Sequence, residues 1–344
     1  MFRSCFLVLF LAIAGFVTTP VSAADPAAKA ATDISQVDGD FAYQGEYLGS
    51  AMNDCGRCQP VGLQVVALGK GEFQAVEYRG GLPGYGWPID GERIKYQGQL
   101  AGETLTLKSE GRQVTISGGR AAIAKVAQGE WSVGNAAKVE RQSPTIGWCA
   151  PRGATVLFDG SQADHWKDGK LVDGLLKEGC ETKAAFGDFQ LHIEYRLPYM
   201  PTARGQGRAN SGVYIQSRYE VQVLDSFGLD GIENECGSLY KQRKPDLNMC
   251  LPPLVWQTYD IWFRGPRFDD SAKKIENARI TLHHNGVAVH DNVEVIAKTG
   301  GGSAEGPQAL VTKLQNHGNP IRYRNIWLVD HGQPTACPRQ VAAQ

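Results

Sequence analysis

The chain has 344 residues and a nearly balanced charge, with 35 lysines and arginines against 36 aspartates and glutamates. A formal net charge of −1 argues against nucleic-acid binding, which calls for a clustered basic surface. The charged fraction of 21% and the 41 glycines are typical of a turn-rich β protein, and the length is sufficient for two domains with real cores.

The first residues have the pattern of a cleaved signal peptide. Arg3 supplies a short basic start, CFLVLFLAIAGFV is apolar, and VSA-A places small residues at the cleavage positions. The apolar run is too short to span a bilayer comfortably, and no later run is long enough. We therefore predict a signal peptide over residues 1–24, a disordered spacer over residues 25–40, and an exported protein in the periplasm or outside the cell.

The cysteine content agrees with export, because seven of the eight cysteines follow the signal peptide and fit an oxidising compartment. Cys55 and Cys58 form a C-x-x-C without a surrounding βαβ pattern or a second C-x-x-C. A local disulfide is therefore favoured over a redox pair or half of a zinc site. Cys236 and Cys250 flank a short polar loop and are candidates for a second disulfide.

Short β-type runs fill residues 41–140, and Gly, Pro or Asp separates them at close intervals. The runs are GLQVVALG, EFQAVEYRG, ERIKYQGQL, ETLTLKSE and RQVTISGG. This spacing predicts a small β-rich domain built as an antiparallel sheet or barrel, with no motif that indicates its role. Residues 141–152 have the composition of a linker.

Longer strands with polar loops follow over residues 153–333, which we predict to form a two-sheet sandwich. His284-Asn285-Gly286 lies between alternating runs and predicts a hairpin, because Asn-Gly accepts the positive φ of a type I′ turn. No window of helical length keeps a 3.6-residue period. The predicted fold class is all-β throughout.

One stretch of this second domain, GRANSGVYIQSRYEVQVLDSFG, carries an unusual density of hydrogen-bonding groups. Read as one strand, it places a polar row on one side: Tyr214, Gln216, Arg218, Glu220 and Gln222. We interpret this row as the floor of a binding groove. His192, Glu194 and Arg196 in FQLHIEYR are interpreted as an ordinary solvated sheet face, while Gln315 and His317 share a side in LQNHGNP.

The groove does not have the usual glycosidase pattern. Glu220-x-Gln222-x-x-Asp225 resembles the E-x-D-x-x-E strand of laminarinase-type β-glucanases, but the middle acid is replaced by Gln222. Those enzymes need two carboxyl groups flanking the scissile bond. A β-glucanase using Glu220 and Asp225 therefore stays an alternative.

Six ordered blocks carry a specific family resemblance over roughly residues 154–330. They are ATVLFDGSQADHW, GDFQLHIEYRLP, NSGVYIQSRYEVQVLDSFG, CGSLYKQRKPDLNMCLPPLVWQTYDIWFR, ARITLHHNGVAVHDNVEV and LQNHGNPIRYRNIW. Together they resemble the bacterial 3-keto-disaccharide hydrolase domain, also described as 3-keto-glucoside 1,2-lyase and 3-keto-2-hydroxy-glucal hydratase. The resemblance implies a concanavalin A-like jelly-roll sandwich and does not cover residues 41–140.

The activity implied by the resemblance is cleavage of 3-keto-glycosides. The C3 ketone acidifies the C2 proton, a general base removes it, the aglycone leaves from C1, and water adds back across the resulting glucal. As catalytic residues we predict His317 as first candidate base, because histidine titrates near neutral pH, Glu220 as second candidate, and Asp225, which could coordinate a cation or turn the chain. Predicted substrate-binding residues are Asn210, Tyr214, Gln216, Arg218, Gln222 and Gln315.

Cofactors and partners follow from the same chemistry. A divalent metal ion could stabilise the C3 enolate, but no metal ligand is assigned, and His283, His284 and His290 are interpreted as exposed hairpin residues. The chain lacks a G-x-G-x-x-G dinucleotide motif, so a separate oxidoreductase would supply the oxidised glycoside. A lectin-like module that binds glycans without cleaving them is the non-enzymatic alternative.

Overall fold

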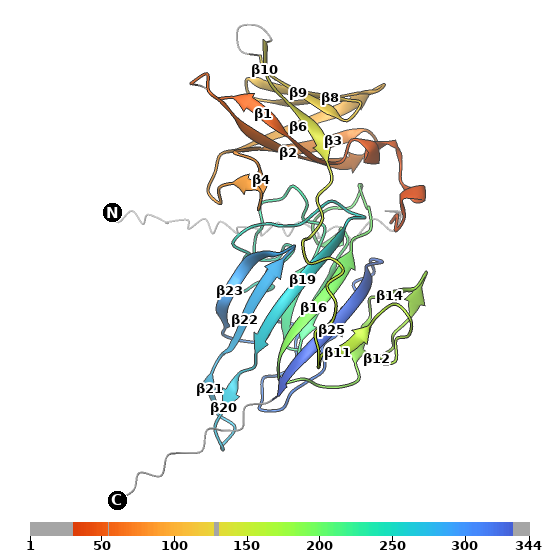
Figure 1. Cartoon of the computed structure of the whole chain (residues 1–344), viewed down its shortest axis with the longest axis vertical. Coiled ribbons are helices and arrows are strands. Elements are labelled where there is room, and N and C mark those ends of the chain that lie inside the picture. The colour runs from red at the N-terminus through yellow and green to blue at the C-terminus, as the bar shows by residue number, and fades with distance from the viewer. Residues whose placement is uncertain (1–29, 54, 127–130, 333–344) are drawn as a thin grey trace, which may run out of the picture.

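The structure is a computed structural model that describes residues 30–53, 55–126 and 131–332. Strands dominate these residues, as predicted, together with three short 3-10 helices: η1 (Ile34–Gln36), η2 (Gly39–Ala42) and η3 (Gly205–Gly207). The described part contains no helix with the length and apolar character needed to cross a membrane. The predicted signal peptide lies outside the described residues. Figure 1 shows a barrel stacked on one end of a larger sandwich.

The smaller domain is a closed antiparallel barrel in which β1 pairs with both β10 and β2. Its strands are β1 (Gly45–Met52), β2 (Cys58–Gly69), β3 (Glu72–Arg79), β6 (Arg93–Ala101), β7 (Thr104–Ser109), β8 (Arg112–Ser117), β9 (Arg120–Lys125) and β10 (Trp131–Val139). Two short strands, β4 (Leu82–Pro83) and β5 (Gly86–Trp87), lie between β3 and β6. Closure leaves no unpaired sheet edge in this barrel.

Strands β2 and β3 are buried on both faces. Val65 and Ala75 point into the barrel core, whereas Val66, Val76 and Tyr78 belong to the hydrophobic cluster that fills the sandwich. Side chains alternate across a strand, so this one pair of strands contributes to two cores. The barrel therefore packs on the sandwich through an apolar wall.

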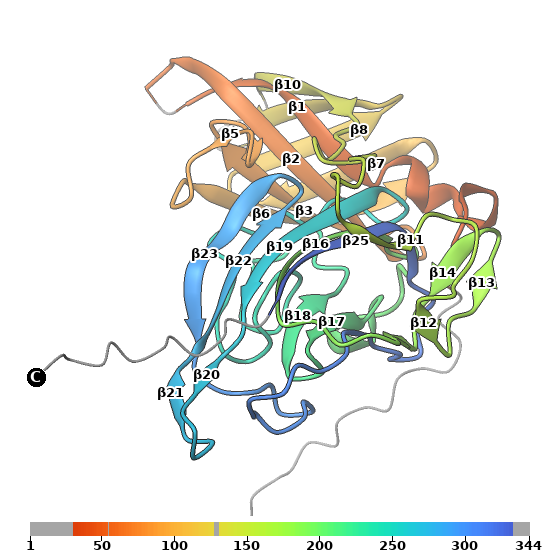
Figure 2. The ribbon, with the colours of Figure 1, turned by 60° about the horizontal axis from the view of Figure 1, so that its bottom comes forward.

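Two antiparallel sheets form the predicted sandwich around this shared cluster. The larger sheet holds β11 (Thr155–Phe158), β13 (Leu171–Val172), β14 (Leu175–Lys177), β16 (Asp188–Arg196), β19 (Trp256–Arg264), β22 (Ala278–His284), β23 (Val287–Val295) and β25 (Arg322–Gly332). The smaller sheet has the order β12 (Trp166–Lys167), β15 (Cys180–Thr182), β24 (Lys313–Leu314), β17 (Ser211–Ile215) and β18 (Tyr219–Val223). In Figure 2 the larger sheet curves around β17 and β18. A separate ribbon pairs β20 (Arg267–Phe268) with β21 (Lys274–Glu276).

The predicted hairpin at Asn285-Gly286 is confirmed. Both residues have positive φ, 50° and 76°, and they join β22 to β23. The histidines beside it differ from the prediction, because His284 and His290 are buried. His284 Nε2 lies 2.9 Å from Tyr195 Oη inside the sandwich. Burial lowers the pKa of His284 to about 3, so this imidazole is neutral.

Residues 30–40, predicted as part of a disordered spacer, pack against the sandwich instead. Ala31 pairs with Tyr199 through two backbone hydrogen bonds of 3.0 and 2.8 Å. Tyr199 Oη also donates a hydrogen bond to Asp38, and its ring packs edge-on against Phe41. The compositional prediction was wrong because these contacts come from a distant part of the chain.

The four cysteines of the two predicted disulfides are free thiols in the structure. Cys55 and Cys58 are exposed near the turn that leads into β2, where Cys58 pairs with Met52. Cys236 Sγ lies 3.1 Å from Tyr259 Oη and 3.4 Å from Tyr195 Oη. Cys236 and Cys250 are in direct side-chain contact as two thiols, so the structure brings this predicted pair together.

Candidate active site

The polar row predicted along one strand is folded into a hairpin. Strands β17 and β18 are joined by Gln216, Ser217 and Arg218, and the first two have φ angles of 49° and 53°. Positive φ at both central residues is the type I′ geometry, here adopted without glycine. Gln216 compensates by donating from Nε2 to the carbonyls of Phe186 and Gly187 at 2.8 and 3.1 Å. The single-strand prediction was wrong because these loop contacts fix the turn.

The hairpin still keeps the polar side chains on one face. Tyr214 lies opposite Glu220, and Gly212 lies opposite Gln222. Directly opposed residues in an antiparallel pair point to the same side of the sheet. Folding the row in half therefore brings Tyr214 and Glu220 together instead of leaving them along one strand.

Gly212 makes the room that Glu220 occupies. A Cβ atom at Gly212 would stand 2.4 Å from Glu220 Oε1 and 3.0 Å from its Cγ and Cδ. The glycine of the NSG motif therefore serves a close approach, because any side chain would collide with the carboxyl group.

Glu220 is a buried carboxyl group that accepts a 2.7 Å hydrogen bond from the Tyr214 hydroxyl. Its exposed fraction is 3%. Burial raises the pKa of Glu220 to about 7, although the hydrogen bond from Tyr214 acts in the opposite direction. Burial also raises the pKa of the Tyr214 phenol, and the neighbouring carboxylate adds to that rise. A carboxyl group with this pKa can accept and release a proton near neutral pH.

A group of amide side chains comes from β18 of this hairpin and from the segment that precedes β17. Gln222 Nε2 is 3.2 Å from both Asn210 Oδ1 and Gln206 Oε1. Asn210 Nδ2 donates to the backbone carbonyl of Gln206 at 2.8 Å, and the Asn210 backbone N–H donates to Asn319 Oδ1. The structure thus brings predicted residues Asn210 and Gln222 together and adds Gln206, which the sequence did not indicate.

Two predicted substrate-binding residues have their hydrogen bonds inside the protein. Arg218 donates to the carbonyls of Ala304 and Gln308 and to Gln216 Oε1, at 2.9, 3.0 and 2.9 Å. Both Arg218 and Gln216 are buried. These contacts hold the turn and the loop that follows β23, so the structure gives both residues a supporting role.

The surroundings of Asp225 and His317 differ from those of the Tyr214–Glu220 pair. Asp225 is buried and accepts a 2.6 Å hydrogen bond from Arg208 Nε, which forms an ion pair. His317 is exposed in a bend three residues after β24 ends. The predicted first candidate base therefore lies at the surface, whereas the second candidate is enclosed.

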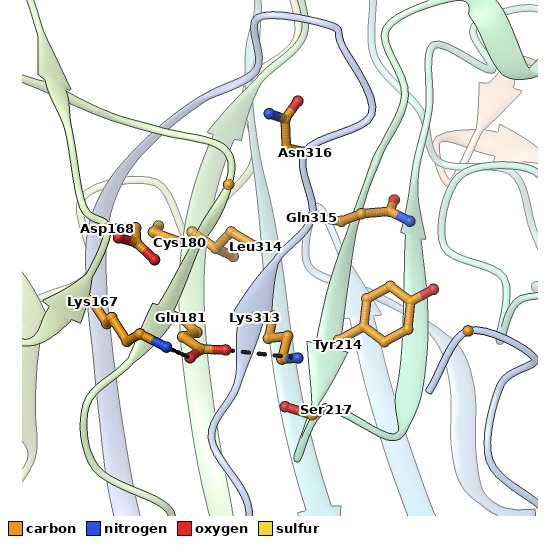
Figure 3. A pocket seen from close by; sticks show the side chains of 12 residues that line it. Lys167, Asp168, Cys180, Glu181, Tyr214, Ser217, Lys313, Leu314, Gln315 and Asn316 are labelled. Carbon is orange, nitrogen blue, oxygen red and sulfur yellow. Dashed lines mark hydrogen bonds and ion pairs between the residues drawn. The ribbon is translucent and has the colours of Figure 1, made fainter. Parts of the chain in front are cut away.

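A cavity of about 460 Å³ opens over the smaller sheet, as Figure 3 shows. Tyr214, Gln315, Lys313, Glu181 and Lys167 line it from four neighbouring strands and the end of β24. Glu181 lies 2.8 Å from Lys167 Nζ and 3.6 Å from Lys313 Nζ. Charged groups thus occupy one end of the cavity, and Tyr214 and Gln315 occupy the other (Figure 3).

Lys167, Glu181 and Lys313 were missed from the sequence. They lie on strands of two or three residues, which give no readable alternation. Gln315 was predicted, and its side chain lines the cavity. Glu220 does not line the cavity itself, so Tyr214 stands between Glu220 and the open space.

The second polar strand, FQLHIEYR, is not a solvated face. His192 and Glu194 are fully buried, and His192 Nδ1 lies 2.6 Å from Asp260 Oδ1. The His192 ring stacks between Trp148 and Trp327, with centroids 6.4 and 5.1 Å away. The solvated-face prediction was wrong because residues 143–148 of the linker cover this part of the sheet. Arg196 is half-buried and donates to the carbonyl of Thr32.

Hydrogen bonds set the charges of this covered cluster. Burial alone would raise the pKa of Glu194, but donors from His192, Asn325, Gly147 and Arg324 lower it to about 2. Burial would lower the pKa of His192, yet Asp260 and Glu194 raise it above its usual value. The cluster is therefore a network of paired charges that fixes the linker.

No three His, Cys, Asp or Glu side chains within the described ranges converge in a way that could hold a metal ion. The groups that surround the cavity are amide, phenol, lysine and carboxyl groups. These residues can donate hydrogen bonds to sugar oxygens and can move one proton.

The sequence profile of the 3-keto-alpha-glucoside-1,2-lyase-like domain matches residues 153–329, which is just over half of the chain. The chain belongs to this family. The match contains both sheets of the sandwich and therefore the whole cavity wall described above. The lyase-like domain is thus carbohydrate-active by family, and its family implies a 3-keto glycoside substrate.

Solved structures of proteins from Parabacteroides distasonis ATCC 8503, proposed to be glycosyl hydrolases, are similar to the chain. One is 32% identical, covers 53% of this chain and 85% of its own length, and has a TM-score of 0.49. A second is 18% identical, covers 52% and 94% of the two chains, and has a TM-score of 0.38. No curated protein matches the chain.

Proposed function

We propose that the lyase-like domain cleaves 3-keto-glucosides by removing the C2 proton and eliminating the C1 substituent, with water adding afterwards to the glucal. The observation that carries this proposal is the buried Tyr214–Glu220 pair at the cavity wall. Elimination beside a ketone requires one base of suitable pKa, and Glu220 has a pKa of about 7.

In this mechanism Tyr214 is the group that meets the substrate. Its hydroxyl already donates to Glu220 at 2.7 Å. As Tyr214 Oη takes the C2 proton, its own proton passes to Glu220. The C–H electron pair forms the enolate, which then expels the C1 oxygen as the leaving group. Lys313 and Gln315 line the same cavity and offer N–H donors for sugar oxygens and for the developing enolate.

A β-glucanase mechanism has less support from the geometry. It needs a second carboxyl group acting across the bond from Glu220. Asp225, the candidate from the sequence, is buried in its ion pair with Arg208. Elimination needs a single base, so the Tyr214–Glu220 pair is sufficient.

The proposal is tested with matched 3-keto and unoxidised glucosides, measuring free aglycone and glucal absorbance. Wild type should act on the keto sugar alone, and Glu220→Gln should lower kcat by about 10²–10⁴-fold, the usual contribution of a general base. Glu233→Gln makes the same change at an exposed position and should retain wild-type kcat. A parallel assay with chelator reports any metal requirement.

Three outcomes would overturn parts of the proposal. Cleavage of the unoxidised sugar would favour the glucanase, and saturable sugar binding without cleavage would favour the lectin. Loss of activity in His317→Ala with activity retained in Glu220→Gln would indicate that His317, and not Glu220, is the general base.

The biological setting is also proposed. Because ordinary sugars do not carry a C3 ketone, a separate oxidoreductase must supply the substrate. The pattern of residues 1–24 supports export to the periplasm or beyond. Detection of the protein in the cytoplasmic fraction of the source cell would contradict export.

A further inference from the structure

A second cavity, of about 400 Å³, lies between the barrel and the sandwich. Its walls come from segments far apart in sequence, including Phe41, Gln44, Ile146, Leu254 and Trp256. It lies outside the smaller sheet that forms the candidate active site. Small-molecule sites favour such concave, mainly apolar positions at domain junctions.

Gln44 gives this cavity a specific polar group. The residue is 3% exposed, and its Oε1 accepts a 3.0 Å hydrogen bond from the Ala67 backbone N–H. That bond assigns the two ends of the amide, because the backbone N–H can donate only to the oxygen. The remaining Nε2 donor is buried and has no hydrogen-bond partner. A buried donor without an acceptor costs free energy that a ligand oxygen would recover.

Three cationic side chains around the cavity have partners within the protein. Arg141 holds Glu46 through two hydrogen bonds of 2.5 and 2.6 Å, and Arg324 Nε donates to Glu194 at 2.6 Å. Lys138 Nζ donates to the carbonyl of Ala42. Lys138 and Glu140 add one charge of each sign to the lining. The cavity therefore offers no net charge for an ionic ligand.

The backbone conformation of Leu254 is a further sign that this cavity is a ligand-binding site. It has a φ of 68° in a loop that contributes Pro252 and Pro253 to the lining. A bulky residue in the left-handed region is uncommon and costs conformational energy, and such strain gathers at ligand-binding positions.

We propose that this cavity binds an uncharged small molecule with an apolar, ring-sized body and one carbonyl or hydroxyl oxygen, which accepts a hydrogen bond from Gln44 Nε2. This site is separate from the sugar-cleaving site and does not depend on the proposed function. The apolar walls contact the body of the ligand, and Gln44 selects for the oxygen.

The test uses acetophenone as the probe. Ethylbenzene is the control that lacks the oxygen acceptor, and benzoate is the charged control. Binding is followed by calorimetry and by the side-chain amide resonance of Gln44. Acetophenone should bind saturably with a Kd on the order of 1 mM or tighter, given the affinity that ligands of this size reach. Ethylbenzene and benzoate should bind at least about tenfold more weakly.

Gln44→Glu at pH 8 keeps the acceptor for Ala67 and replaces the free donor by an oxygen, so acetophenone binding should fall at least about tenfold. Gln97→Glu makes the same change at an exposed barrel position and should leave binding unaltered. Ile146→Trp fills the cavity from the linker side and provides a second test if Gln44→Glu does not fold. Equal binding of acetophenone and ethylbenzene, unchanged binding in either cavity variant, or no saturable binding would overturn the proposal.

Discussion

Glu220 is a carboxyl group that the fold favours in its neutral form. Its pKa is about 7 in the folded protein and near 4.5 in an unfolded chain. The folded state therefore retains the proton to higher pH, so the free energy of unfolding should fall as pH rises from about 4.5 to about 7. The full decrease is on the order of 3 kcal/mol, from 1.36 kcal/mol per pKa unit.

Glu220→Gln should remove this pH-dependent loss. We expect the variant to gain stability over the wild type as pH rises from 5 to 8, with a relative increase of about 2–3 kcal/mol. Urea unfolding at the two pH values measures the change. A constant difference between variant and wild type across that range would show that Glu220 is ionised normally.

Tyr214 gives a second prediction at the scale of single residues. Because Tyr214 stands between Glu220 and the cavity, Tyr214→Phe should lower kcat about as severely as Glu220→Gln, by roughly 10²–10⁴-fold. The measurement is a pH profile of kcat for each variant. Retained kcat with an acidic limb moved to higher pH would show that Glu220 acts directly, because loss of the Tyr214 hydrogen bond raises the Glu220 pKa further.

Single residues of this site were partly predictable from the sequence. Glu220, Tyr214 and Gln222 were predicted because one strand carried too many hydrogen-bonding groups for a solvated face, and Asn210 because it begins the Asn-Ser-Gly stretch before that strand. Alternation cannot say which of those groups bonds to the protein itself, so Arg218 was predicted as a ligand-binding residue although it holds the loop at Ala304.

At the scale of elements, the hairpin formed by β17 and β18 depends on Gly212. A side chain there would be forced into Glu220, so Gly212→Ala should displace the carboxyl group. We expect kcat/KM to fall at least tenfold and stability to fall by about 1–3 kcal/mol, as in other overpacked sites. Steady-state kinetics and thermal unfolding measure the two effects.

Gly207→Ala is the matched control for that substitution. Gly207 lies in η3, and a Cβ atom there has no neighbour within 4 Å. It should leave kcat/KM near the wild-type value. Similar losses in both variants would indicate that the whole region is sensitive to change, not the contact with Glu220.

Two hairpins of the sandwich show what local sequence can predict about elements. Asn285-Gly286 was predicted because both residues accept positive φ at low cost. Gln216-Ser217 has the same geometry but no such chemistry, and its turn is held by hydrogen bonds from Gln216 to the carbonyls of Phe186 and Gly187. A turn fixed by distant groups leaves no signal in its own residues.

At the scale of the molecule, the linker cluster connects domain placement to acid stability. Glu194 has a pKa of about 2 in the folded protein and near 4.5 in an unfolded chain. Its contribution is present above about pH 4.5 and should be lost as pH falls toward 2. Its size is on the order of 3 kcal/mol.

Glu194→Gln should therefore destabilise the protein at pH 7 by a few kcal/mol and flatten its acid unfolding curve between pH 4.5 and 2. Circular dichroism along an acid titration measures this. Asp230→Asn is the control, because the exposed pairs of Asp230 with Arg93 and Lys95 should contribute less than about 1 kcal/mol. An unchanged acid midpoint in Glu194→Gln would exclude this role.

The all-β class and the sandwich were predictable for the whole molecule, because period-2 runs and turn residues extend along the entire chain. The burial of His192 and Glu194 was not predictable from the sequence, because it depends on where residues 143–148 lie in space. The closed path of the barrel was one of two predicted alternatives, and nothing local distinguishes a closed sheet from an open one.

The apolar wall formed by Val66, Val76 and Tyr78 restricts how these domains can be exchanged during evolution. Neither domain is an independent module, because part of the sandwich cluster is encoded on the outer face of β2 and β3. A different domain joined before this sandwich would have to present apolar side chains at the same place. Gene fusion alone would therefore be insufficient, and substitutions on both sides of the junction would have to accompany it.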